Sequence, residues 1–387
     1  MEKCKLGDIC EIVSGSTPKT TIEEYWDGDI KWITPAELNE NVYIINDSVR
    51  KITKLAVEKT GLSSFPEGTV ILSTRAPIGK VAIAGCEMYC NQGFKNLICS
   101  EKIFNKYLYW FLKGNTMFLN SIGRGATFKE ISKAIVSEIE INVPEIEEQH
   151  EIVKILEKVN TIIRFRKQEL SVLDTLVKAR FVEMFGNSDI NEKNWSVYKM
   201  EQLCKVGSSK RIYQNDQSLT GIPFLRISDL VNRMDTGSKD CDLFIPEEFF
   251  EKLKKQGLVP ARGDILLTAR GTLGRCYIIQ DDDEFYFQDG MITWLSKYDE
   301  KITPLYISYL FEMPGFRKQI DSLQAGSTVA YLSISMTKKL NVMVPPFELQ
   351  NQFADFVNQV NKSKVKIQKA LDETQKLFDS LMQQYFG

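Results

Sequence analysis

The sequence predicts an α+β fold built from two mixed α/β domains, each followed by a long helix. Three observations support this fold. The second half of the chain repeats the first, short apolar runs separated by turn residues open each half, and an apolar stripe with helical spacing closes each half. The 387 residues are too many for one typical domain, and 43% hydrophobic residues suffice for real cores.

The internal repeat appears when the second half is aligned on the first. Three pairs of segments carry it, at offsets of 192 (222 − 30), 195 (263 − 68) and 201 (326 − 125) residues: 30–38 with 222–230, 68–83 with 263–278, and 125–186 with 326–387. The last pair aligns without a gap over its whole length. The front of each unit therefore tolerates insertions, whereas its back half does not.

Each unit has the same order of expected elements. Apolar runs punctuated by Gly, Pro, Asn and Asp predict short strands and turns. Aromatic helical segments follow at 106–122 and 304–323. The helical spacing of the aromatic residues in the first segment favours core packing over a base-stacking platform, and these residues are Tyr107, Tyr109, Trp110 and Phe111. A Gly-rich loop and a strand come next. The strand ends at proline, which suits the first turn of a helix.

The closing segments predict two helices of about 40 residues, roughly 60 Å each at ~1.5 Å per residue. Their apolar residues form a coiled-coil-like seam, broken by polar residues near Arg166 and at Lys364 and Thr374. The seam positions are Ile152, Leu156, Val159, Ile163, Leu170, Leu173, Val177, Phe353, Val357, Val360, Ile367, Leu371, Phe378 and Leu381. Pairing of the two helices is favoured over packing of each on its own domain, because the stripes are too long for one domain to cover.

These elements set the expected organisation of the chain. We expect a first domain over 1–144, its helix over 145–186, a polar linker over 187–194, a second domain over 195–345 and its helix over 346–387. No run approaches the ~18–20 apolar residues of a membrane span. The start of the chain lacks the apolar run of a signal peptide, so we expect a cytoplasmic protein with reduced cysteines.

Most catalytic chemistry lacks its residues. His150 is the one histidine, which argues against catalytic triads and histidine-rich metal sites. There is no C-x-x-C and no Walker lysine motif, and no strand pair supplies a nuclease-like magnesium site. The segment Val344-Pro345-Pro346-Phe347 resembles a DNA adenine methyltransferase motif, but its first residue cannot hydrogen-bond a base. We expect no enzyme activity, no metal and no bound cofactor.

Basic and hydroxyl side chains recur in the turns of both units and are the candidate DNA contacts. Arginine and lysine on loops can reach phosphates or make bidentate contacts to guanine. The candidates are Ser16, Thr17, Lys19, Arg75, Lys80, Arg124, Thr127, Lys129, Lys210, Arg211, Arg226, Arg270, Arg275 and Thr328. Ordinary solvated surface charge is the alternative for each. Arg75 and Arg270 stand out because the same turn carries arginine in both repeats.

The combined pattern resembles the specificity subunit of a type I restriction–modification system. The resemblance covers essentially the whole chain and rests on GSTPKTTIEEYWDGDIKWITPAEL near the start, STRAPIGKVAI with TARGTLGRCYI, the GAT and GST loops, and VPEIEEQHEI with VPPFELQNQF before the long helices. The second repeat keeps Gln149 as Gln350 but has Leu349 where the first has Glu148.

The resemblance implies a non-catalytic reader of double-stranded DNA. Two target-recognition domains, related by a pseudo-twofold, would each read half of a split asymmetric site. The helices would pair antiparallel and set the spacer. Two modification subunits with adenine methyltransferase activity and the motor-nuclease restriction subunits would be partners. S-adenosylmethionine, ATP and magnesium would be bound by those partners.

Two other function classes compete with this interpretation. A stand-alone DNA-binding regulator would bind tightly by itself, but the net charge of −2 and the pI of 5.8 argue against it because isolated affinity depends on phosphate contacts. A self-contained methyltransferase would bind S-adenosylmethionine, and no donor-binding loop is present in the sequence.

Overall fold

The computed structural model describes residues 2–39, 42–75, 77–125, 129–323 and 330–387. The chain forms two compact units, one of residues 1–167 with 369–387 and the other of residues 168–368. Each unit therefore contains the globular part of one repeat, the first part of the helix that follows it, and the last part of the other long helix. Two α+β units are observed, as the sequence predicts.

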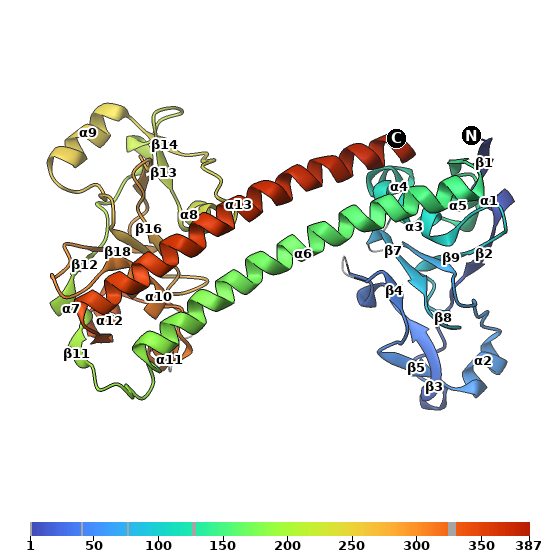
Figure 1. Ribbon diagram of the computed structural model, residues 1–387, viewed down its shortest axis with the longest axis horizontal. Helices are drawn as coiled ribbons and strands as arrows, with labels where there is room; N and C mark the ends of the chain where they lie inside the picture. The colour runs from blue at the N-terminus through green and yellow to red at the C-terminus, as the bar shows by residue number, and fades with distance from the viewer. Residues whose placement is uncertain (1, 40–41, 76, 126–128, 324–329) are drawn as a thin grey trace. The chain divides into compact units, whose positions relative to one another are not determined.

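A mixed sheet forms the centre of the first unit (Figure 1). Its strand order is β2 (Cys10–Ser14), β9 (Phe94–Cys99), β6 (Val70–Thr74), β7 (Ile78–Ala84) and β4 (Ile44–Ile45). The pairs are antiparallel except β4 with β7, which is parallel. All five residues of β6 are buried, which suits the central place of this apolar strand.

Smaller elements complete the first unit. A second sheet has the order β5 (Arg50–Ile52), β3 (Trp26–Ile33) and β8 (Tyr89–Cys90), and β1 (Glu2–Lys5) pairs with β10 (Glu140–Val143). The Arg50 guanidinium lies 3.8 Å from the ring centroid of Trp26. The helices are α1 (Leu6–Ile9), η1 (Glu23–Tyr25), η2 (Pro35–Glu37), α2 (Lys54–Thr60), α3 (Asn105–Gly114), α4 (Thr116–Ile122) and α5 (Lys133–Ser137).

The second unit repeats this plan with different loops. Its main sheet has the order β12 (Lys205–Gly207), β18 (Ile292–Ser296), β15 (Ile265–Thr268), β16 (Cys276–Ile278), and its small sheet the order β14 (Phe244–Ile245), β13 (Ile222–Leu225), β17 (Tyr286–Phe287). β11 (Ser196–Lys199) pairs with β19 (Asn341–Val344). The helices are α7 (Met200–Leu203), η3 (Gln214–Asp216), α8 (Ile227–Thr236), α9 (Glu247–Lys255), α10 (Pro304–Leu310), α11 (Pro314–Leu323) and α12 (Ile334–Lys339).

The two long helices are α6 (Ile146–Phe185) and α13 (Phe347–Phe386), each of 40 residues. The start of α6 packs in the core of the first unit through Ile152 and Leu156, and its end packs in the core of the second through Val177. For α13 the order is reversed, because Phe353 lies in the second core and Phe378 packs against the first. Each long helix thus ends on the globular part of the other repeat.

Aromatic pairs attach the ends of these helices. In the first unit, the ring centroids of Trp110 and Phe378 lie 5.6 Å apart. In the second unit, Phe181 stacks on Tyr306 at 5.3 Å. The aromatic residues of α3 are therefore buried core residues, with Trp110 only 2% exposed. The sequence prediction of core packing rather than a stacking platform is confirmed.

All fourteen predicted seam residues are buried or half-buried. Those at the outer ends of the helices are covered by the globular cores. Direct pairing of the seam residues with one another stays a prediction. All eight cysteines, each in the described part of the chain, are free thiols, as expected for reduced side chains. None of the helices in the described ranges combines the length and apolarity of a membrane span.

Candidate nucleic-acid interface

The first unit brings the β6–β7 turn and the loop after α4 side by side. The backbones of Arg75 and Arg124 each form an isolated antiparallel β-bridge with that of Glu130. The backbone nitrogen of Ile131 donates to the Thr74 carbonyl at 3.0 Å, and the Arg124 nitrogen to the Glu130 carbonyl at 3.0 Å. Arg124 and Lys129 are exposed. Three of the predicted basic residues therefore belong to one surface, the basic loop pair: Arg75, Arg124 and Lys129.

The second unit builds the equivalent surface with other side chains. The Arg270 backbone forms an isolated antiparallel β-bridge with that of Tyr331, and the Arg270 guanidinium carbon lies 5.4 Å from the tyrosine ring centroid. The backbone nitrogen of Leu332 donates to the Ala269 carbonyl at 3.0 Å. These residues occupy the positions of Arg75, Glu130, Ile131 and Thr74 in the repeat alignment. The conserved backbone contacts join turn and loop in both units, while the side chains on them differ.

Three other candidates of the first unit lie on the loop after β2, and a fourth, Lys80, lies on β7. Ser16 and Lys19 are exposed, and their backbone carbonyls accept hydrogen bonds from the indole nitrogens of Trp32 and Trp26. Thr17 donates to the side chain of Gln92. Lys80 is half-buried and its Nζ donates to the Pro35 carbonyl at 3.0 Å. Lys80 thus holds β7 to the segment after β3, which is a structural contact.

Several basic candidates of the second unit are held by acidic partners. Arg226 makes a two-pronged contact with Asp229, at 2.9 and 3.1 Å. Arg211 contacts Asp289 at 2.8 Å, and this hydrogen bond raises the pKa of the arginine. Arg275 donates to Asp235 at 2.6 Å and thereby lowers the pKa of that carboxyl group. Lys210 is exposed, and Arg270 is the exposed basic residue of the turn.

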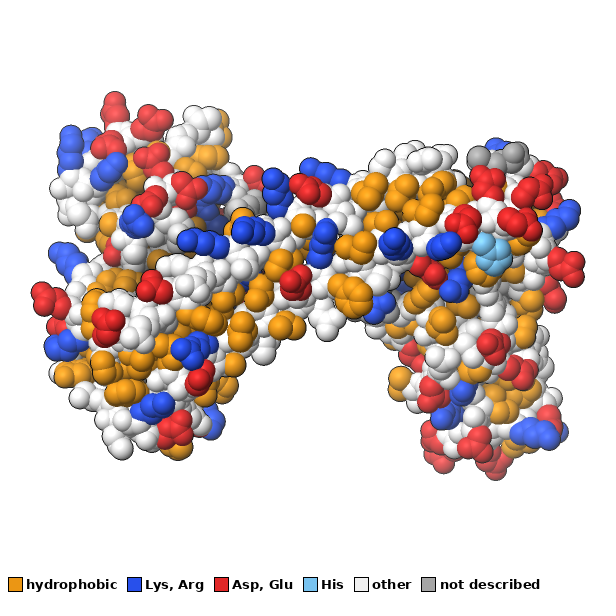
Figure 2. Space-filling view, viewed as in Figure 1, with side chains coloured by type: hydrophobic (Ala, Val, Ile, Leu, Met, Phe, Trp, Pro, Cys, Tyr) orange, Lys and Arg blue, Asp and Glu red, His pale blue; other side chains and the backbone are white. Residues whose placement is uncertain are grey.

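Two candidates fall outside the described residues. Thr127 lies in 126–128 and Thr328 in 324–329. The sole histidine, His150, is exposed at the start of α6, where its ring lies 4.0 Å from that of Phe104 (Figure 2). Within the described ranges, no three His, Cys, Asp or Glu side chains form a group that could hold a metal ion.

Sequence reasoning did not identify the role of the glutamine that follows each proline corner. Gln149 is fully buried; its Nε2 donates to the Lys102 and Pro144 carbonyls, and its Oε1 accepts from the Phe104 nitrogen. Gln350 does the same with Lys301, Pro345 and Thr303. The glutamine shared by the starts of the two long helices was the sequence feature from which this role could have been predicted. It ties the first turn of each long helix to the backbone of the segment before α3 or α10.

Comparison with known proteins decides what this repeated arrangement is. The family model described as type I restriction modification DNA specificity domain matches the chain twice, over residues 1–175 and 192–375. The chain belongs to this family. Each match covers one repeat and most of the helix that follows it.

Relatives within the specificity family extend over most of the chain. The chain is 30% identical to the type I restriction enzyme MjaIX specificity subunit of Methanocaldococcus jannaschii, over 98% of this chain and 90% of the relative. It is 26% identical to the putative type I restriction enzyme specificity subunit S.HindORF215P of Haemophilus influenzae, over 72% of this chain and 71% of the relative.

Solved structures share the fold of this chain. The S subunit of a type I restriction–modification system from M. genitalium aligns with a TM-score of 0.56 at 16% identity, covering 100% of this chain and 96% of that one. A chain from a study of complex assembly and conformational transition of the type I R-M system aligns with a TM-score of 0.62 at 15% identity, covering 100% and 97%. The protein is thus a DNA-recognition subunit of the type I restriction–modification class, a non-catalytic family, and a stand-alone regulator is not favoured.

Proposed function

We propose that this specificity subunit reads a split, asymmetric DNA site, one half with each domain. The observation that carries the proposal is the basic turn and loop, built with the same backbone contacts around Arg75 and around Arg270. The side chains beside these arginines differ, with Glu130 in one unit and Tyr331 in the other. Two similar surfaces with different side chains suit two different half-site sequences, because base contacts carry the sequence information.

We further propose that α6 and α13 pair antiparallel and set the spacer between the half-sites. Within the first unit, Arg166 of α6 contacts Thr374 of α13. Within the second unit, Asp174 contacts Lys364 at 2.6 Å. As residue numbers rise along α6 they fall along α13, which supports antiparallel pairing. Helices of roughly 60 Å can carry domains to half-sites about one turn of DNA apart, ~34 Å.

The chemistry would then belong to partner subunits. We propose that the chain binds two modification subunits that methylate adenine, together with the restriction subunits. S-adenosylmethionine, ATP and magnesium would be bound by those partners. The support is family membership, because the relatives are named as subunits of type I restriction enzymes, and the sequence, which lacks the motifs for these ligands.

Mapping of methylated adenines tests this function. Genomic DNA would be exposed to the purified chain together with its modification subunits, and the methylated positions would be sequenced. The proposal predicts two different half-site sequences separated by a constant spacer, and no methylation by the chain alone. A palindromic or undivided site would contradict the assignment of one domain to each half-site. Methylation by the chain alone would contradict the division of labour between subunits.

A further inference from the structure

A cavity of about 730 Å³ lies within the second unit, where the β15–β16 turn meets α10, α11 and the two long helices. Four basic side chains from four different elements line it: Lys178, Arg233, Arg275 and Arg317. Glu312 is the one acidic residue among its described lining residues. Tyr277 and Tyr309 add aromatic surface. The volume is in the range of small-molecule sites, roughly 300–1,000 Å³.

Arg233 is the least expected residue in this cavity. It is only 9% exposed, and its Nε has no hydrogen-bond partner among the described residues. Its one carboxylate partner, Asp283, is 3.5 Å from Nη2 and already accepts from the Tyr277 hydroxyl at 2.9 Å and the Gln280 nitrogen at 2.8 Å. A buried donor without a partner is unfavourable, and this incompletely bonded cation is one of the residues that line the cavity.

The other three cations are held in place by single partners. Lys178 contacts Glu312 at 3.0 Å, Arg275 contacts Asp235 at 2.6 Å, and Arg317 donates to the Leu273 carbonyl. A guanidinium has five N–H donors, so these contacts leave donors available to a ligand. Glu312 is the one carboxylate in the described lining, so the four lining cations outnumber the lining carboxylates, while Asp235 and Asp283 pair with Arg275 and Arg233 from outside the described lining. The lining is therefore positive and already positioned.

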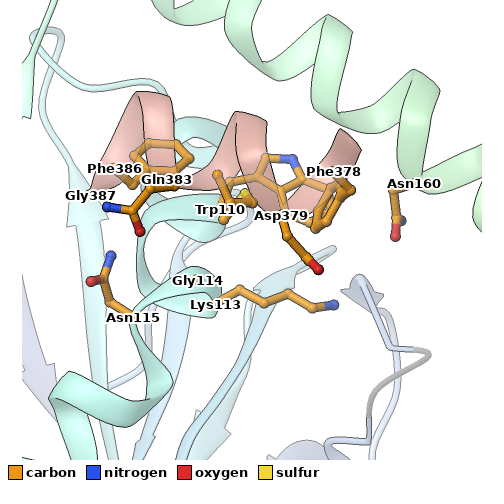
Figure 3. A pocket seen from close by; sticks show the side chains of 11 residues that line it. Trp110, Lys113, Gly114, Asn115, Asn160, Phe378, Asp379, Gln383, Phe386 and Gly387 are labelled. Carbon is orange, nitrogen blue, oxygen red and sulfur yellow. The ribbon is translucent and has the colours of Figure 1, made fainter. Parts of the chain in front are cut away.

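The first unit has a cavity at the equivalent place, of about 430 Å³ (Figure 3). The repeat offset of 201 places Asn160 and Asp379 there at the positions of Asn361 and Lys178. Trp110 corresponds to Tyr309, because each follows by three residues a tyrosine, Tyr107 or Tyr306, whose hydroxyl donates to a carbonyl of the strand before the long helix. Lys113, at the position of Glu312, is the one basic residue among its described lining residues.

The equivalents of two of the arginines are also different in the first unit. Thr116 lies beside Gly79 in the first unit, and Arg317 lies beside Gly274 in the second. A neutral residue therefore stands in the first unit where the second has Arg317. Lys80, at the position of Arg275, donates to the Pro35 carbonyl and does not line the cavity. The same fold forms without the basic lining, so the four cations of the second unit are not required to build it.

We propose that the basic cavity of the second unit binds a phosphate group. Guanidinium groups match phosphate oxygens in charge and in the spacing of their donors. The phosphate has two possible sources. Arg275 lies on the same turn as Arg270, so DNA lying on that turn could place a backbone phosphate in the cavity. This source of phosphate rests on the proposed function. Inorganic phosphate or a small phosphate ester is the other source and does not depend on it.

Thermal unfolding of the full chain tests the free-phosphate source. Inorganic phosphate would be compared with chloride at matched pH and ionic strength, because a ligand that binds the folded state raises the unfolding midpoint. Arg317→Gln should weaken the apparent phosphate affinity by about tenfold or more, the loss of a charged hydrogen bond. Glu312→Gln should strengthen it. Lys113→Gln, in the first cavity, is the matched control and should behave as the unsubstituted chain.

Salt-dependent binding of a mixed-sequence DNA duplex tests the other source. Loss of one phosphate contact reduces the slope of log affinity against log salt by about one. Arg317→Gln should show this reduction and Lys113→Gln should not. A positive result in either assay supports the phosphate site and names its source.

The proposal is overturned if phosphate affinity and salt slope are the same in Arg317→Gln, Glu312→Gln and the unsubstituted chain. Should Arg317→Gln fail to fold, Glu312→Gln decides the matter, since an unchanged affinity in both assays overturns the proposal. If the unsubstituted chain and its assembled complex bind no duplex at all, the proposed function is contradicted. The phosphate assay then still tests whether the cavity binds phosphate.

Discussion

Arg166 of α6 donates hydrogen bonds to the hydroxyl of Thr374 and to the carbonyl of Ala370 in α13. The polar residue that interrupts the first apolar stripe thus meets a polar residue that interrupts the second. The remaining interruption, Lys364, pairs with Asp174. Polar residues in an apolar helical seam fix its register at some cost in stability.

The Arg166–Thr374 contact predicts an asymmetry between single and double variants. Thr374→Val leaves the half-buried arginine with one partner fewer and should reduce the free energy of unfolding by about 1 kcal/mol. Arg166→Met with Thr374→Val should return stability to near that of the unsubstituted chain, because neither partner is then unsatisfied. Urea unfolding of the two single variants and the double variant measures the coupling. Strictly additive effects on the free energy of unfolding would show that Arg166 and Thr374 are not energetically coupled.

The buried glutamines predict large and equal losses in the two repeats. Gln149→Ala leaves the Phe104 nitrogen and two carbonyls without partners and should cost about 2–4 kcal/mol, and Gln350→Ala should do the same. Exposed Glu147→Ala is the control and should stay within about 0.5 kcal/mol. Denaturant midpoints compare the three variants. A glutamine variant as stable as the control would remove the glutamine from the helix-positioning role.

The basic turns predict separable losses of DNA binding. Arg75→Ala and Arg270→Ala should each weaken binding of the assembled complex by about 1–3 kcal/mol, the usual loss for a bidentate base contact. Each should relax the sequence preference in one half-site only. Arg262→Ala is the control, since Arg262 precedes β15 whereas Arg270 follows it, and its ion pair with Asp281 is exposed. Unchanged binding by folded Arg75→Ala or Arg270→Ala protein would exclude that arginine as a contact.

Replacement of residues 1–144 by the corresponding domain of a relative should change one half-site and leave the other intact. The structure adds a condition, because the end of α13 packs on this domain through Phe378 and Leu381. A donor domain with an aromatic residue at the position of Trp110 should fold with the existing helix, whereas one without it should lose stability. Methylation mapping reads the outcome. A change in both half-sites would contradict the assignment of one domain to each.

The sequence was informative wherever local pattern and burial agree. The apolar stripe, the aromatic segments and the proline corners predicted both long helices and the core role of Tyr107 and Trp110. Each aromatic segment nevertheless forms two helices, broken at Asn115 and before Pro314. The apolar residues continue on both sides of each break, so the apolar pattern alone does not reveal it.

Features that depend on distant partners could not be predicted. The packing of Phe378 on Trp110 joins residues far apart in the chain, and nothing local to α13 identifies that partner. Arg233 reads as an ordinary helical residue in the sequence, and its burial depends on Asp283 and Phe285 about fifty positions later. Arg275 reads as a free cation, yet it is paired with Asp235, forty positions earlier. Arg226 also reads as free, although its partner Asp229 lies only three positions on and was open to local reasoning.

The spacing role of the long helices is the central claim, and matched deletion tests it most directly. Removing seven residues from each helix, 167–173 and 365–371, keeps the 4-3 spacing and shortens each by about 10 Å at ~1.5 Å per residue. Deletion from one helix alone is the control and should disrupt assembly. Methylation mapping of the doubly shortened complex should show both half-sites unchanged and the spacer shorter by about three base pairs, at ~3.4 Å each. An unchanged spacer, or altered half-site sequences, would contradict the account.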